Sequence, residues 1–139
     1  MPETVDRVDH VSILVRSIDA SIGYYRDRLR LPIVRDDRLP ELGVRLVLLD
    51  AGNTFLQLVE PTGAGPLKDD LDRLGECLHH VCFAVKDIDV ATARLSPEEA
   101  VSVSLGGQGQ RVAFLLSSPN GVKTELTETE PYRSREGGE

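Results

Sequence analysis

The three histidines of this chain lie in two similar apolar stretches, and their chemistry is what the rest of the fold must position. The stretches are Val8-Asp9-His10-Val11-Ser12-Ile13-Leu14-Val15 and Leu78-His79-His80-Val81-Cys82-Phe83-Ala84-Val85. Aligning them places His10 on His80, 70 residues apart. Imidazole is the commonest protein metal ligand and the usual acid–base group near neutral pH. A lone histidine in a strand is more often a hydrogen-bonded residue, so the spacing of further ligand-type residues decides between these readings.

A second pair of ligand-type residues repeats at nearly the same spacing. Gln57 lies in Leu56-Gln57-Leu58-Val59-Glu60, and Glu125 lies in Thr124-Glu125-Leu126-Thr127-Glu128, 68 residues later. Glu125 taken alone could be an edge-strand charge. Because similar offsets occur at both ends of the two segments, the sequence indicates an internal duplication.

Strand alternation predicts which way these side chains point. In each histidine stretch, every second residue faces the same side of the sheet. The more apolar set should pack under a helix, which turns the histidine set toward whatever the sheet encloses. The helix-facing sets are Val11, Ile13 and Val15 in the first stretch, and Val81, Phe83 and Val85 in the second. By the same alternation His79 faces away from His80, and we expect it to be structural.

If the two halves form one curved sheet, His10 and His80 converge with Gln57 and Glu125. Two imidazoles, one amide oxygen and one carboxylate suit a borderline divalent ion such as Co²⁺, Mn²⁺, Ni²⁺ or Zn²⁺. Four protein ligands leave positions open for water or substrate, as metal catalysis requires. The sequence therefore predicts a metal site.

Both halves show the element order β-α-β-β-β. Ser17 and Asp87 are suited to begin the two helices as N-caps, and Gly75 is suited to end a helix that links the halves. In the first half we predict a strand over 5–15, a helix from Ile18 to Leu29, and strands over 33–35, 44–49 and 54–60. The linking helix is predicted over 67–74. In the second half we predict a strand over 78–85, a helix ending by Pro97, and strands over 101–103, 111–116 and 122–127. The glycine-rich stretch 106–109 lacks the strand-turn-helix context of a phosphate loop and reads as a plain connection.

The length fits a single domain over residues 1–139, and the element order makes it an α+β fold, with one βαβββ module over about 5–62 and another over about 76–128. The net charge of −7 argues against a nucleic-acid partner. No apolar run approaches the roughly 20 residues of a membrane span. The first four residues lack the basic and apolar regions of a signal peptide, so a cytoplasmic location is expected. The polar tail over 129–139 is expected to be disordered.

The two cysteines are expected to be buried and reduced. Cys77 and Cys82 are five residues apart on one predicted strand, so they point to opposite faces. They cannot easily bridge each other, and their spacing is not that of a zinc site.

These residues resemble those of the vicinal oxygen chelate superfamily, the group of the glyoxalase and bleomycin resistance proteins. Within it the chain is most similar to the methylmalonyl-CoA epimerase family, over roughly residues 6–128. The motifs that carry the resemblance are Asp9-His10-Val11, Tyr24-Tyr25, Pro40-Glu41-Leu42-Gly43-Val44, Gly52-Asn53-Thr54, Leu56-Gln57-Leu58-Val59-Glu60-Pro61 and Gly75-Glu76-Cys77-Leu78-His79-His80. The stretch Phe114-Leu115-Leu116-Ser117 departs from the family's F-L-H-P run.

The resemblance implies a curved mixed sheet of paired βαβββ modules around a divalent metal, held by His10, Gln57, His80 and Glu125. It also implies epimerisation of methylmalonyl-CoA or a related acyl-CoA through α-proton abstraction and a metal-stabilised enolate. Glu125 would act as one acid–base group as well as a ligand. Some epimerases carry a glutamate two residues after the Gly-Val pair, where this chain has Leu46, so the second acid–base group is open. A homodimer is expected from the resemblance alone.

Two other functions remain open from the sequence. One is a glyoxalase-like lyase, or another enzyme that uses the same metal site, and the other is a small-molecule-binding or resistance protein. The four ligand-type residues count against pure binding. The cations that could hold the phosphates of a CoA ligand are Arg45, Lys68, Arg111 and Lys123, although each alone reads as a solvated surface charge.

Overall fold

The structure is a computed structural model that describes residues 5–95, 99, 103–105, 110–116 and 118–128. It divides into two compact units: the first is residues 10–79, and the second combines the residues up to Asp9 with those from His80 onward. Each unit is described by itself below.

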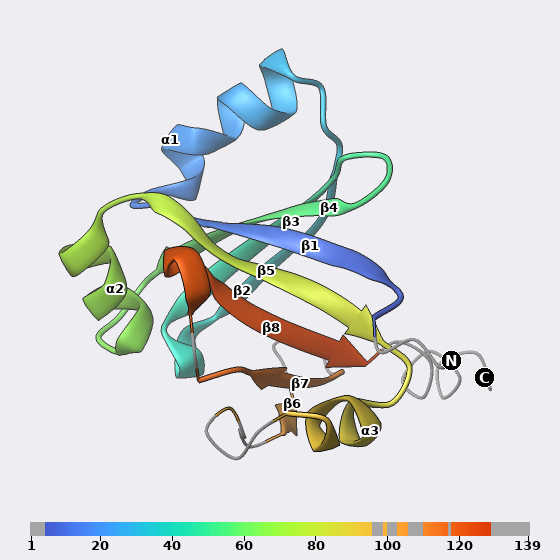
Figure 1. The fold of residues 1–139 in the computed structure, drawn as a ribbon. Coiled ribbons are helices and arrows are strands. Elements are labelled where there is room, and N and C mark those ends of the chain that lie inside the picture. The colour runs from blue at the N-terminus through green and yellow to red at the C-terminus, as the bar shows by residue number, and fades with distance from the viewer. Residues whose placement is uncertain (1–4, 96–98, 100–102, 106–109, 117, 129–139) are drawn as a thin grey trace. The chain divides into compact units, whose positions relative to one another are not determined.

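The first unit contains both parallel and antiparallel strand pairs, and its parallel pair requires a crossover connection. The strands are β1 (Arg7–Leu14, whose first three residues belong to the second unit), β2 (Ile33–Leu39), β3 (Val44–Asp50) and β4 (Phe55–Pro61), in the order β2-β3-β4-β1 (Figure 1). β1 pairs parallel with β4, whereas β2–β3 and β3–β4 are antiparallel. A parallel pair cannot be joined by a hairpin. The chain therefore leaves β1, passes through a helical segment and returns through β2 and β3 before it reaches β4.

The helical segment after β1 begins where the sequence predicts and covers the apolar face of the strands. Ser17 caps α1 (Ile18–Ile22) by accepting a hydrogen bond from the Ala20 N–H at 3.1 Å. The chain continues over Gly23–Arg28 as a wider helix, in which the Leu29 N–H donates to the Tyr24 carbonyl. The core under it comprises Val15, Ile18, Ile22, Val47, Leu49 and Leu58, with Ile13 packed against it. The predicted helix-facing positions Ile13 and Val15 are therefore confirmed.

A second helix closes the other face of the first unit. α2 (Pro66–Leu74) begins with proline, whose missing N–H costs nothing at a first helical position, and is followed by Gly75 at φ 76°. That left-handed conformation suits glycine, as the sequence predicted. Leu71 of α2 is buried with Leu14, Val44 and Val59.

The second unit repeats this topology with shorter elements. Its elements are β5 (Cys77–Val85, of which residues 77–79 belong to the first unit), α3 (Ile88–Ala93), β6 (Ser104–Leu105), β7 (Arg111–Phe114) and β8 (Lys123–Glu128), with strand order β5-β8-β7-β6. β5 is parallel to β8, and the other two pairs are antiparallel. Asp87 caps α3 through the Asp89 and Val90 N–H groups. The core contains Val85 and Ile88, with Phe83 packed against it.

The strand register confirms the duplication residue by residue. Ser12 lies opposite Gln57 across β1 and β4, and Cys82 lies opposite Glu125 across β5 and β8. Residues related by the sequence offsets of 70 and 68 therefore occupy equivalent positions in the strand pairs of the two modules. The α+β class and the two βαβββ modules are confirmed.

A carboxylate on the last strand of each module also holds the start of that module's helix. Glu60 accepts from the Ile18 N–H at 2.9 Å, and Glu128 accepts from the Ile88 N–H at 3.1 Å. A negative charge there satisfies an otherwise unpaired helix donor and complements the helix dipole. The repeat thus extends to the residues that fix the helices on the sheet.

Several predicted boundaries are wrong. The strand predicted over 33–35 runs to Leu39, because Arg35–Arg38 pair with β3 as an exposed edge. Only Ile18–Ile22 of the first predicted helix has α-helical geometry, and β7 stops at Phe114. The second helix ends at Ala93, before Pro97 as predicted. Val103, the one described residue of the strand predicted over 101–103, is not in a strand and precedes β6 at Ser104–Leu105. Pro97, residues 101–102, the 106–109 loop and the 129–139 tail lie outside the described residues.

The union of the two modules in one domain stays a prediction. In the described part of the chain, no helix has the length and apolar character needed to cross a bilayer.

Candidate metal centre

The first unit brings His10 and Gln57 to one face of two neighbouring strands. His10 is paired with Phe55 and Ser12 with Gln57 in a parallel register, so His10, Ser12 and Gln57 face the same side. His10 and Gln57 are each 7% exposed. Ser12 Oγ donates a 2.6 Å hydrogen bond to Gln57 Oε1. An amide oxygen has two lone pairs, so Oε1 retains one for a cation.

The second unit brings His80 and Glu125 into direct contact. His80 Nε2 lies 3.1 Å from Glu125 Oε1, and both side chains are buried. The His80 and Phe114 rings pack edge to face, with centroids 5.2 Å apart and planes at 83°. Phe114 lies opposite Glu125 on β7. The imidazole is thus held from two sides, by a carboxylate and by an aromatic ring.

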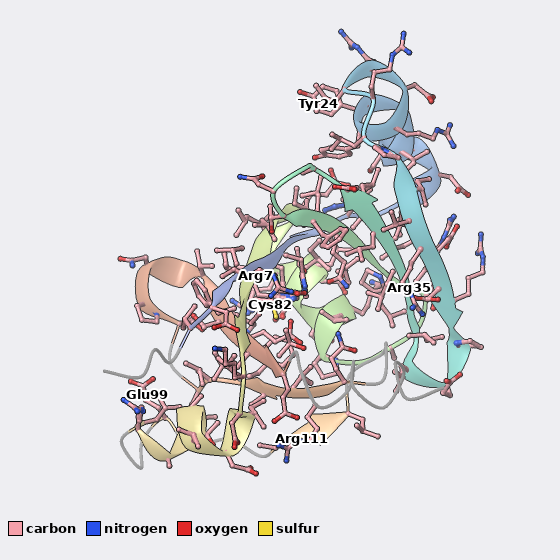
Figure 2. The ribbon with its side chains drawn as sticks, turned by 90° about the vertical axis from the view of Figure 1, so that its right-hand side faces the viewer. Arg7, Tyr24, Arg35, Cys82, Glu99 and Arg111 are labelled. Carbon is pink, nitrogen blue, oxygen red and sulfur yellow. The ribbon has the colours of Figure 1, made fainter. Side chains whose placement is uncertain are left out.

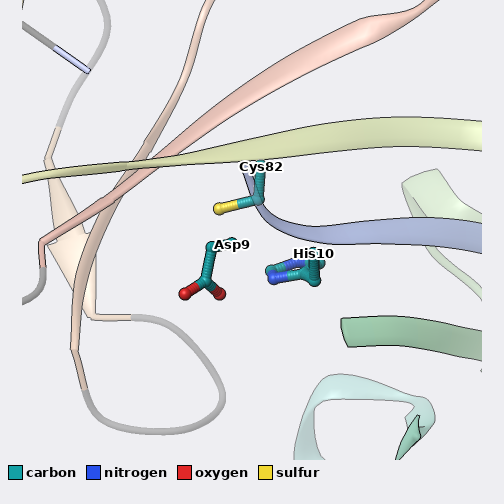
Figure 3. Close-up of side chains that lie close together, drawn as sticks. All are labelled: Asp9, His10 and Cys82. Atoms are coloured by element: carbon teal, nitrogen blue, oxygen red, sulfur yellow. The ribbon is translucent and has the colours of Figure 1, made fainter. Parts of the chain in front are cut away.

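Cys82 lies beside Glu125, on the same face of β5 as His80, as a neutral thiol. It is fully buried and forms a side-chain hydrogen bond with Glu125. Burial raises the pKa of the Cys82 thiol far above its ordinary value, and the carboxylates of Glu125 and Asp9 raise it further. The Asp9 carboxylate, which belongs to the same unit, lies close to the thiol (Figure 3). The Cys82 side chain is fully buried, whereas the Arg111 side chain is partly exposed (Figure 2). Both cysteines are free, as predicted, but only Cys82 is buried, and Cys77 is partly exposed.

The geometry of the His80–Glu125 pair fits a metal as well as a hydrogen bond. Nitrogen and oxygen ligands bind such ions at about 2.0–2.2 Å, so two ligand atoms at right angles lie about 3 Å apart. The 3.1 Å separation matches that spacing. Neutral imidazole, amide oxygen and carboxylate are a donor set for borderline divalent ions. The structure brings the predicted ligands together as one pair in each unit, and their union around one ion stays a prediction.

His79 and three of the four cations considered for phosphate binding are engaged elsewhere. His79 Nε2 lies 2.9 Å from Asp70 Oδ2 of α2, which confirms its structural position. Arg45 binds Asp36 and Asp19, Arg111 binds Glu128 and Asp89, and Lys68 binds Asp72. Lys68 and Arg111 are at least partly exposed, as expected of surface charges, whereas the Arg45 side chain is buried, so the expectation of a solvated surface charge is wrong for Arg45. Lys123 lies on β8 opposite His80.

Position 46 lies on the ligand-bearing face of the first unit but offers no proton-transfer group. Leu46 pairs with Val59, two residues beyond Gln57 on the same side of β4. Its side chain packs against the cluster of Leu14, Val44, Val59 and Leu71. The side of β3 and β4 that carries Gln57 is therefore apolar at the next positions, Leu46 and Val59.

Strand alternation places Ser12 and Cys82 on the faces of the two histidines, but the sequence reasoning did not identify their contacts with the predicted ligands. Ser12 and Cys82 lie two residues after the two histidines, on the same strand face. Their matched positions in the repeat were a signal that could have identified them.

Comparisons with known proteins identify the family of the chain. Residues 9–114 match the Glyoxalase/Bleomycin resistance protein/Dioxygenase superfamily. The chain is 32% identical to the mitochondrial methylmalonyl-CoA epimerase of Mus musculus, over 86% of this chain and 71% of that protein. It is 30% identical to an ethylmalonyl-CoA/methylmalonyl-CoA epimerase of Cereibacter sphaeroides, over 88% of this chain and 97% of that protein.

Among solved structures, a variant of Streptomyces coelicolor methylmalonyl-CoA epimerase in complex with 2-nitronate-propionyl-CoA is similar in fold. Its TM-score is 0.77 at 31% identity, with 92% of this chain and 97% of that chain covered. The family match spans most of the chain, and relatives at 30% identity or more align over nearly all of it. The chain therefore belongs to the Glyoxalase/Bleomycin resistance protein/Dioxygenase superfamily.

Proposed function

We propose that this protein is a metal-dependent epimerase of methylmalonyl-CoA or a related acyl-CoA. The observation that carries the proposal is the repeated ligand pair: His10 with Gln57 in one unit, and His80 with Glu125 in the other, at equivalent register positions. The named epimerases among the relatives support the acyl-CoA substrate. The ion proposed for this site is Co²⁺, Mn²⁺, Ni²⁺ or Zn²⁺.

In this proposal His10, Gln57, His80 and Glu125 together hold one divalent ion. The ion would supply positive charge that stabilises the negative charge developing on the thioester oxygen. The three neutral ligands and one carboxylate leave a net positive charge on the complex, which favours an anionic substrate form. The burial of all four side chains strengthens that attraction, because water screens it less.

Glu125 is the residue proposed to move the α-proton. It carries the only negative charge in the proposed ligand set, and it has a second carboxylate oxygen beside the one that faces His80. Inversion also requires a proton donor on the opposite side of the substrate carbon. Leu46 cannot serve as that donor, so the second group lies elsewhere. A cytoplasmic location and a homodimer stay predictions.

The test is proton NMR of methylmalonyl-CoA in D₂O with the Co²⁺-loaded protein. We expect deuterium to enter the α position well above the uncatalysed rate, together with interconversion of the two epimers. Glu125→Gln is the decisive variant, because Gln57 occupies the equivalent position in the first module. The variant should retain a ligand-type amide and still bind Co²⁺, while deuterium exchange falls by about 10²-fold or more.

Thr127→Val provides the matched control for Glu125→Gln. Thr127 lies two residues further along β8 on the same face, and Val59 occupies its equivalent position in the first module. This variant should exchange deuterium like the wild type. Bound Co²⁺ without any α-exchange would contradict the epimerase proposal. Turnover of a thiol hemiacetal by the same sample would then favour a glyoxalase-like lyase, and metal binding without turnover would favour a binding protein.

A further inference from the structure

Each of the two oxygen-bearing side chains proposed as ligands has a small hydrogen-bonding residue directly across the strand pair. Ser12 lies opposite Gln57, and Cys82 lies opposite Glu125. Both are fully buried. The Ser12 hydroxyl donates to Gln57 Oε1 at 2.6 Å, and the Cys82 thiol is hydrogen-bonded to Glu125. The same contact is thus made twice, at equivalent positions of the repeat.

We infer that Ser12 and Cys82 are a matched pair of positioning residues, which orient Gln57 and Glu125 so that one lone pair of each is available to a divalent ion. The inference rests on the proposed function, because it assigns these two residues a role in the proposed metal site. It concerns contacts that lie wholly within one unit in each case.

The need for such residues differs between the two ligands. An amide side chain can turn its oxygen or its nitrogen toward a cation, and only the oxygen binds it. A donor at Ser12 holds the oxygen end on that face. A carboxylate has two equivalent oxygens, so the Cys82 thiol only limits rotation, and a weaker donor suffices. The stronger donor, the Ser12 hydroxyl, therefore lies beside Gln57, the ligand that could turn a non-binding atom toward the ion.

Removing either donor should weaken metal binding without removing a ligand. Loss of outer contacts to metal ligands typically costs 10–100-fold in affinity. We expect Ser12→Ala and Cys82→Ala each to raise the Co²⁺ dissociation constant by about tenfold or more. Cys82→Ser restores a hydroxyl of the kind found at Ser12 and should bind within about threefold of the wild type, because it retains a donor.

The experiment is a Co²⁺ titration of these variants, with Thr127→Val as the control for a buried change on a neighbouring strand. The control should bind like the wild type. Unfolding of each variant in EDTA separates a folding defect from a change in affinity. A second measurement needs no metal: Ser12→Ala should shift the Gln57 side-chain amide signals in the NMR spectrum of the metal-free protein.

The outcomes are distinct. Wild-type affinity in both alanine variants, with loss of binding in His80→Ala, would overturn the positioning inference and leave the proposed metal site standing. Absence of Co²⁺ binding by the wild type would instead contradict the proposed function. A sulfur-to-cobalt charge-transfer absorption that disappears in Cys82→Ser would also overturn the inference, because Cys82 would then be a ligand itself.

Discussion

Thr127 is a buried polar residue whose hydroxyl gains little from its surroundings. It is 2% exposed on β8, and its Oγ1 has no hydrogen-bond partner among the described residues. An unsatisfied buried hydroxyl costs roughly 1–3 kcal/mol in folding free energy. We therefore expect Thr127→Val to raise the free energy of unfolding by about 1 kcal/mol, measured by urea denaturation of the metal-free protein.

Thr124→Val is the control for this change. Thr124 lies on the same strand, faces the other side and is only partly buried. Its hydroxyl can reach water, so the substitution should change stability by less than about 0.5 kcal/mol. A loss of stability in Thr127→Val would show that the hydroxyl has a partner in solution.

Leu46 supports a second prediction at the level of single residues. It lies beside Val59 on the face that carries Gln57, where some epimerases place an acid–base group. A carboxylate introduced into this partly buried apolar cluster would have a raised pKa, which suits proton transfer near neutral pH. We expect Leu46→Glu to raise the rate of epimer inversion relative to the rate of deuterium exchange.

The measurement is chiral analysis of methylmalonyl-CoA beside the NMR exchange assay. Leu46→Gln has a similar shape and cannot transfer a proton, so its ratio should stay at the wild-type value. An equal ratio in both variants would show that position 46 does not reach the substrate carbon. The second proton donor of this protein would then lie on another strand.

At the level of the elements, two glutamates fasten the helices to the strands with unequal support. Glu60 accepts from the Ile18 N–H, and Glu128 accepts from the Ile88 N–H. Glu128 is also bound by Arg111, with Nε at 2.7 Å from Oε1, and its side chain is only 3% exposed. We expect Glu128→Gln to lower the free energy of unfolding by about 2 kcal/mol, because a charged hydrogen bond in a buried position is lost.

Glu60→Gln should cost less, about 1 kcal/mol, because an amide oxygen still accepts from the helix start and Glu60 is more exposed. Urea denaturation of both variants without metal measures the difference. Equal losses would indicate that the Arg111 pair contributes nothing to stability beyond the helix contact.

The sequence predicted these elements well where one interaction decided the outcome. Ser17 and Asp87 begin their helices because each side chain accepts from the first turn. Gly75 ends α2 because its backbone adopts a positive φ. Such local signals are readable in one sequence, since they involve residues close together in the chain.

The failures at β2, Ser12 and Cys82 come from pairing between distant segments. The charged stretch Arg35–Arg38 has no apolar alternation, yet it forms β2 because the β3 edge supplies the partners. The hydrogen bonds of Ser12 and Cys82 likewise depend on register across 45 and 43 residues, which only the assembled strands fix. The ligand positions were predictable because the duplication marks them twice, whereas Leu46 has no ligand-type equivalent to mark it.

At the scale of the whole molecule, the proposed site makes a prediction about both units at once. One ion held by His10 and Gln57 on one side, and by His80 and Glu125 on the other, would stabilise two compact units together. A ligand at 100 times its dissociation constant stabilises the folded state by about 2.7 kcal/mol. We therefore expect Co²⁺ to slow amide hydrogen exchange in both β1–β4 and β5–β8, and EDTA to reverse this.

His80→Ala distinguishes a shared ion from one held by a single unit. If the ion needs both pairs, the substitution in the second unit should remove the Co²⁺-dependent protection of β4 in the first unit as well. Hydrogen-exchange mass spectrometry of peptides covering Phe55–Pro61 and Lys123–Glu128 measures both effects in one sample. Protection of β8 alone in the wild type would mean that the ion is held by His80 and Glu125 without the first unit. The repeated residue pairs would then reflect only the duplication of the module, and the second unit alone would bind metal.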